Sequence, residues 1–134
     1  MLPFDFIEQM RPLLGAELDA FLHALQTERE TSVRLNNKVD FQQLKLLREA
    51  GLEEVPWCPE GYYVKQRPQF TLDPMLHAGR YYVQEASSMF VQRVLERYVS
   101  PDSIVLDMCA APGGKSTLIS EHLGEEGLLI SNEV

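Results

Sequence analysis

The chain has 134 residues, of which 45% are hydrophobic, and its formal net charge is −8 at pH 7. This composition is that of a globular protein, and the acidic balance argues against binding nucleic acid through bulk charge attraction. Two cysteines are too few for a disulfide framework, and no apolar run approaches the roughly 20 residues of a membrane helix. With no secretory signal visible, we expect a cytoplasmic protein without membrane contact.

The first elements expected are helical. Apolar side chains recur at threes and fours over residues 3–27, which predicts two helical pieces that separate near Pro12 and Gly15. The alternating run 31–36 predicts a short strand. A modest basic stretch follows the helices, and ordinary charge mixing on a solvated face is its first interpretation: Arg29, Arg34, Lys38, Lys45 and Arg48.

Asp40 can cap a helix that continues to Ala50 and stops at Gly51. Its expected inward residues are Phe41, Leu44 and Leu47. Residues 55–65 predict an irregular hairpin, because prolines and a glycine punctuate a strand-like run. Together these elements predict a small N-terminal α+β module over residues 1–75.

A second unit is expected over residues 76–134. The predicted elements alternate between strand and helix, with a turn at 100–102: a strand at 81–83, a helix at 86–98, a strand at 103–108, a helix at 115–123 and a strand at 128–132. This order predicts the beginning of a parallel α/β sheet. A complete doubly wound sheet has several more strands, so we expect this unit to be incomplete, truncated after its second strand.

A Gly-rich turn joins the strand 103–108 to the helix that follows it. Gly113 and Gly114 lie at the start of that helix, where backbone N–H groups and the helix dipole favour a negatively charged ligand group. Glu133 follows 19 residues after Gly114, at the end of the next strand. An acid at about 20 residues from such a turn is where Rossmann-type folds bind a ribose.

Three interpretations of this turn are open. A phosphate-binding loop of the Walker type needs a glycine at the position that Cys109 occupies, and the Gly-x-Gly-x-x-Gly pattern of dinucleotide sites is absent. A strand that ends in Asp107, a turn of small residues and a ribose acid are typical of S-adenosylmethionine sites. A helix start without any ligand is the remaining alternative.

The string DMCAAPGGKS at Asp107–Ser116 resembles the cofactor motif of the RNA (cytosine-5) methyltransferases of the Nol/Nop/Sun family. His77–Met89 is similar to the motif that precedes the cofactor strand in that family, and Ser32–Asn36 and Gly61–Val64 resemble parts of its leading module. The resemblance implies a Rossmann-like, S-adenosylmethionine-dependent methyltransferase domain that acts on ribosomal RNA of the small subunit. It also implies that Glu133 binds the cofactor ribose and that one loop wraps the cofactor: Cys109, Ala110, Ala111, Pro112, Gly113, Gly114 and Lys115.

The same resemblance implies that catalysis needs residues beyond this chain. In the family one cysteine thiolate adds to carbon 6 of cytosine and a second cysteine assists product release. Neither Cys58 nor Cys109 matches those positions, so no catalytic residue is expected here and the chain alone is expected to be inactive. Cys109 is expected to be a buried, inert thiol, and Gln84 and Glu85 are expected to shape the wall beside the cofactor.

Two further expectations complete the prediction. No spacing of His, Cys or acidic residues predicts a metal site. The strand 128–132 is expected to leave an apolar face and a sheet edge open, which favours self-association. The alternative to an enzyme is a non-catalytic RNA- or protein-binding module.

Overall fold

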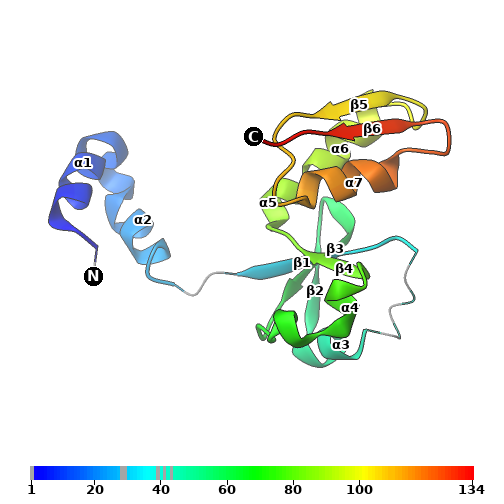
Figure 1. The fold of residues 1–134 in the computed structure, drawn as a ribbon. Helices are drawn as coiled ribbons and strands as arrows, with labels where there is room; N and C mark the ends of the chain where they lie inside the picture. Colours follow the sequence, from blue (N-terminus) through cyan, green and yellow to red (C-terminus); the bar gives the residue numbers. More distant parts are fainter. Residues whose placement is uncertain (1, 28–29, 39, 41, 43) are drawn as a thin grey trace.

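The computed structural model describes residues 2–27, 30–38, 40, 42 and 44–134. The chain begins with two helices, α1 (Phe4–Leu14) and α2 (Leu18–Ala24), joined by the short 3-10 helix η1 (Gly15–Glu17). The predicted break is confirmed at Gly15, which takes a φ of 52° and ends α1, whereas Pro12 lies inside the helix. Figure 1 shows this helical pair apart from the remainder of the protein.

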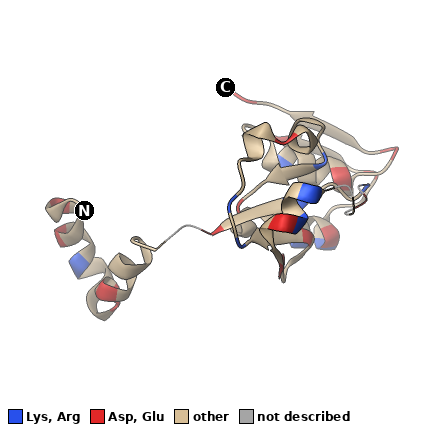
Figure 2. Ribbon diagram, turned by 90° about the horizontal axis from the view of Figure 1, so that it is seen from below, with Lys and Arg blue, Asp and Glu red and all other residues tan. Residues whose placement is uncertain are grey.

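The charge of the helical pair is acidic. Arg11 is its only Lys or Arg among the residues described, against Asp5, Glu8, Glu17 and Asp19 (Figure 2). Such a surface repels a phosphate backbone. No helix in the described part of the chain combines the length and apolar character that crossing a membrane requires.

A four-stranded antiparallel sheet forms the centre of the first unit. Its strands are β1 (Thr31–Leu35), β2 (Leu52–Val55), β3 (Cys58–Val64) and β4 (Tyr81–Val83), in the order β2-β3-β1-β4. Among the described residues between these strands are the short helices α3 (Lys45–Ala50), η3 (Phe70–Leu72) and α4 (Pro74–His77). Their apolar side chains pack with Val33, Leu35 and Tyr81 into one core, which includes the predicted inward residues Leu44 and Leu47.

Two expectations for this unit differ from the structure. The helix predicted from Asp40 begins at Lys45, because the Asp40 carboxylate instead accepts a hydrogen bond from the Gln42 amide at 2.9 Å in a local turn. Phe41 lies outside the described residues. The strand 81–83 pairs with β1 in the first sheet rather than with the strands that follow it. The boundary after residue 75 stays a prediction.

The remaining elements form a second, parallel sheet with its helices. They are α5 (Ala86–Met89), α6 (Val91–Tyr98), β5 (Ile104–Asp107), α7 (Gly114–His122) and β6 (Leu128–Ser131). Strands β5 and β6 pair in parallel, and α7 connects them. One face of this pair packs on α6 and α7 through a core around Leu95, Leu118 and Ile119. The predicted α/β fold is therefore confirmed (Figure 1).

The opposite face of the β5–β6 pair is open and apolar. Ile104 is 74% exposed and Leu128 is 50% exposed, and Leu106 and Ile130 are exposed beside them. These exposed apolar residues alternate with the partly buried Val105 and Leu129, so both faces of the strands are apolar, as in a sheet with helices on its two faces.

We expect this open face to make the 134-residue chain self-associate. Sedimentation velocity over a range of protein concentrations should show species heavier than the 15.3 kDa monomer, because contiguous apolar area drives association. The variant Leu106→Lys places a charge in the middle of the face and should shift the distribution toward monomer. A single 15.3 kDa species at every concentration would contradict this expectation.

Candidate functional site

The carboxyl ends of β5 and β6 meet the beginning of α7. Asp107, the last residue of β5, accepts a hydrogen bond from the Ser116 hydroxyl at 2.7 Å and one from the Cys109 amide at 3.2 Å. The hydroxyl of Ser131, at the end of β6, donates to Ser116 at 3.1 Å. Asp107 therefore holds the turn between strand and helix, and both strands are tied to the first turn of α7.

The Gly-rich loop lies against the segment that follows β6. The Ala110 amide donates to the Asn132 carbonyl at 3.1 Å, and the Ala111 amide donates to a carboxylate oxygen of Glu133 at 2.7 Å. Gly113 precedes α7 with a φ of 109°, a left-handed backbone conformation that residues other than glycine rarely adopt. The loop and the acid that the sequence singled out are thus in direct contact.

The first sheet supplies the other wall of this site. The Tyr82 hydroxyl donates to the Pro112 carbonyl at 2.6 Å. A Cβ on Gly114 would lie 3.3 Å from the Tyr82 ring and 3.4 Å from the Gln84 side chain, so only glycine fits there without displacing them. A pocket of about 140 Å³ lies between the two walls, lined by Gln84, Glu85, Cys109, Ala110, Ala111, Pro112, Gly114 and Lys115 among others.

The two cysteines differ in their surroundings. Cys109 is exposed, so the expectation of a buried thiol is wrong: the residue lies in the turn beyond β5, outside the core around Leu118 and Ile119. Cys58 is 1% exposed, and its thiol donates to the Gln92 side chain at 2.9 Å. Burial raises the pKa of the Cys58 thiol, which keeps it protonated and unreactive.

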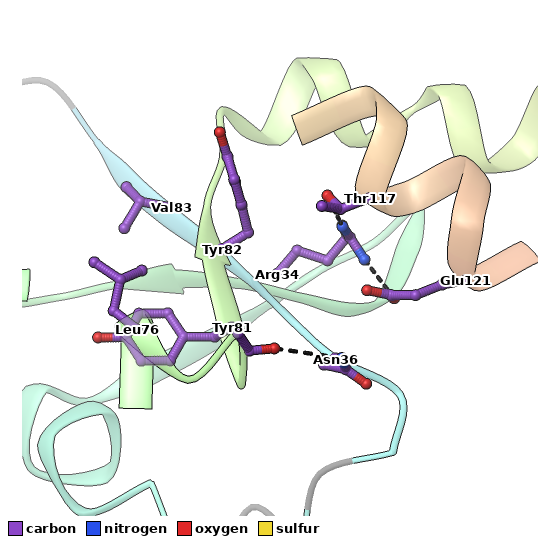
Figure 3. A pocket seen from close by; sticks show the side chains of 9 residues that line it. Arg34, Asn36, Leu76, Tyr81, Tyr82, Val83, Thr117 and Glu121 are labelled. Atoms are coloured by element: carbon purple, nitrogen blue, oxygen red, sulfur yellow. Dashed lines mark hydrogen bonds and ion pairs between the residues drawn. The ribbon is translucent and has the colours of Figure 1, made fainter. Parts of the chain in front are cut away.

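A larger pocket of about 430 Å³ is lined by Arg34, by residues of β4 and by Thr117 and Glu121 of α7 (Figure 3). Arg34 is 3% exposed. It donates to the Gln84 side chain at 3.0 Å and to the Thr117 hydroxyl at 2.8 Å, and it forms an ion pair with Glu121. These contacts join β1, the end of β4 and α7.

Arg34 departs from the interpretation of its stretch as a solvated face, whereas Lys38, Lys45 and Arg48 are exposed as that interpretation expects. Ser32 and Arg34 alternate with Val33 and Leu35 along β1, a pattern that predicts one wet face. Helix α5 lies against β1 and α7 reaches Arg34 through Thr117 and Glu121, so the polar face is covered and all five residues of β1 are buried. Burial also raises the pKa of the Glu121 carboxyl, an effect that the Arg34 charge opposes. The periodicity of the sequence did not indicate that Glu121 would be the partner of Arg34.

The described residues contain no group of three or more His, Cys, Asp or Glu side chains that could hold a metal ion. The site combines a Gly-rich loop with the carboxylates of Glu133 and Glu85, and a tyrosine and a glutamine form its wall. Such an arrangement can bind a ligand that carries a hydroxyl pair for the acid and a polar group for the amides.

Known proteins are similar to this chain in sequence. Residues 2–86 match the family model described as the N-terminal domain of 16S rRNA methyltransferase RsmF. The chain is 36% identical to the ribosomal RNA small subunit methyltransferase F of Enterobacter sp. strain 638 over 141 aligned positions, which cover 98% of this chain and 29% of that protein. The chain thus spans less than a third of the length of that relative.

Two solved structures extend the comparison to the fold. A methyltransferase homologue from Pyrococcus horikoshii is 27% identical, with a TM-score of 0.68 over 97% of this chain and 48% of its own. The crystal structure of NSun6 from Pyrococcus horikoshii with SFG is 18% identical, with a TM-score of 0.79 over 98% of this chain and 58% of its own. The second of these likenesses concerns the fold alone.

Proposed function

Because the chain belongs to the family of the N-terminal domain of 16S rRNA methyltransferase RsmF, we propose that it serves S-adenosylmethionine-dependent methylation of ribosomal RNA. The observation that carries this proposal is the contact between the loop Cys109–Lys115 and Glu133 at the carboxyl ends of two parallel strands. Ligands of open α/β sheets bind at that edge. The family resemblance noted in the sequence is confirmed by the family match and by relatives named ribosomal RNA small subunit methyltransferase F.

In this proposal the loop and the acid divide the cofactor between them. Glu133 accepts the ribose hydroxyls, and the Ala111 amide already fixes one of its carboxylate oxygens at 2.7 Å. Gly113 and Gly114 allow the backbone to approach the methionine end of the cofactor closely. Gln84 and Glu85 form the facing wall, and Lys115 lies at the rim of the pocket, where it can reach toward an RNA base.

The reaction that we propose for the whole protein is methyl transfer to carbon 5 of a cytosine in the small-subunit RNA. S-adenosylmethionine supplies an electrophilic methyl group when it is bound. Carbon 5 of cytosine is a poor nucleophile, and the family activates it through a cysteine thiolate. Cys58 is buried and hydrogen-bonded to Gln92, and Cys109 belongs to the cofactor loop. We therefore assign no nucleophilic role to either cysteine, and we assign binding and orientation of the cofactor to the loop that contains Cys109.

The experiment that tests this function is calorimetric titration of the chain with S-adenosylmethionine, with ATP and magnesium as the comparator. We expect heat of binding with S-adenosylmethionine only, because the loop lacks the first glycine of a phosphate-binding loop. When the same preparation is incubated with S-adenosylmethionine and small-subunit ribosomal RNA, we expect no methylated RNA to form.

Each other outcome has a distinct meaning. Binding of ATP with magnesium would favour the phosphate-loop interpretation. Binding of neither ligand by a folded chain would overturn cofactor binding by these residues and favour a non-catalytic RNA- or protein-binding module. Turnover of the RNA by the chain alone would contradict the assignment of the two cysteines.

A further inference from the structure

We propose that Tyr82 is a positioning residue that fixes the direction of the Pro112–Gly113 peptide in the cofactor loop. This inference rests on the function proposed above for the loop, and it concerns a residue of the first sheet. Tyr82 is intermediate in exposure and lies in β4, which antiparallel pairing with β1 holds in place: Tyr82 is the register partner of the buried Arg34. Its ring therefore projects from a rigid support toward α7, on the same side as Arg34 (Figure 3).

Tyr82 contacts the loop on both sides of Gly113. Its hydroxyl donates to the carbonyl of Pro112 at 2.6 Å, and its ring lies 3.3 Å from the position that a Cβ on Gly114 would take. Gly113 itself has the left-handed φ of 109°. A glycine in that conformation can rotate the peptide before it at little steric cost, so the loop needs an external contact to hold one orientation.

The hydrogen bond determines where the Gly113 amide points. The Pro112–Gly113 peptide bond is trans, and in a planar trans peptide the C=O and N–H groups point in opposite directions. With the Pro112 oxygen held by Tyr82, the Gly113 N–H is directed away from Tyr82. A rotated peptide would instead present a carbonyl oxygen where the amide now lies. Tyr82 thus determines which side of the loop presents the Gly113 donor and which side presents the Pro112 acceptor.

The decisive variant is Tyr82→Phe, which removes the hydroxyl and keeps the ring against Gly114. Tyr98→Phe is the matched control, because Tyr98 is exposed on α6 and its ring pairs with Arg97. Two measurements are made on each variant and on the unchanged chain without ligand: amide hydrogen exchange of residues 109–115, and the NMR shifts of the Gly113 and Gly114 amides. The midpoint of urea unfolding reports whether the fold as a whole is affected.

We expect Tyr82→Phe to accelerate exchange in the loop about fivefold and to move the Gly113 amide signal, the effect of losing one net hydrogen bond. The unfolding midpoint of Tyr82→Phe should fall only slightly, as the loss of one hydrogen bond requires, and loop exchange in Tyr98→Phe should remain as in the unchanged chain. Loop exchange and shifts that are unchanged in Tyr82→Phe would overturn the inference. So would faster exchange spread over the whole sheet, which indicates general destabilisation.

Titration with S-adenosylmethionine separates this inference from the proposed function. Where the unchanged chain binds the cofactor, Tyr82→Phe should weaken the affinity about fivefold and Tyr98→Phe should leave it unchanged. Equal affinities of the unchanged chain and Tyr82→Phe would overturn the positioning role. Where the unchanged chain does not bind, the proposed function fails, and the exchange and NMR measurements still decide whether Tyr82 orients the loop.

Discussion

Replacing Arg34 with methionine is expected to lower the free energy of unfolding by about 3–5 kcal/mol, the usual cost of removing one partner from a buried ion pair. The substitution leaves Glu121 without its counter-charge and Gln84 and Thr117 without their donor. Because these three partners lie on two units of the chain, the loss also loosens the packing of α7 on the first sheet. Urea unfolding followed by Trp57 fluorescence measures the effect, since the Trp57 indole donates to the Ala86 carbonyl at 2.7 Å between the hairpin and α5.

The chain contains a matched control for this prediction. Arg11 forms an exposed ion pair with Glu8 at 3.1 Å within α1, and Arg11→Met should change the stability by less than about 1 kcal/mol. The double variant Arg34→Met with Glu121→Leu removes the stranded carboxylate and should recover part of the loss. Equal and small effects of Arg34→Met and Arg11→Met would show that the buried network does not hold the two units together.

The second large effect is expected at Glu133. On the proposed function, Glu133→Ala should weaken the binding of S-adenosylmethionine by roughly 10-fold to 100-fold, because it removes a charged acceptor for the ribose hydroxyls. It also releases the Ala111 amide from its 2.7 Å hydrogen bond. Calorimetric titration of the variant against the unchanged chain measures the loss.

Two further variants separate these contributions. Glu133→Gln keeps an oxygen that can accept from the Ala111 amide, so it should retain the loop and lose only the part of the affinity that requires a carboxylate. Glu126→Ala removes an exposed acid from the preceding turn and should leave the affinity unchanged. An affinity of Glu133→Ala within twofold of the unchanged chain would remove Glu133 from the cofactor site.

Much of the candidate loop was predictable from local sequence signals. An apolar run that ends in Asp107, adjacent glycines and a later acid can each be recognised within a few residues of sequence. The structure adds that Ala111 and Glu133 are in contact. The order of strands and helices after residue 100 was predictable for the same reason: periodicity and turn residues are local properties.

The features that the sequence did not reveal depend on distant partners. Arg34 meets Glu121 across 87 positions, and Tyr82 meets Pro112 across 30. The alternation along β1 is identical whether water or α7 covers the polar face, so periodicity could not distinguish them. The pairing of β4 with β1 could not be predicted either, because a short β-prone run such as 81–83 contains no information on which sheet it joins.

The pairing of β4 bears on how the leading part of this protein can be expressed by itself. A recombinant piece that stops at residue 75 would lose β4, and β1 would become an edge strand that is unprotected at Val33, Arg34 and Leu35. A piece that stops after Met89 would keep β4 and also the anchor between Trp57 and Ala86. For crystallisation or RNA-binding trials of this part alone, the later stop is the choice that preserves its sheet.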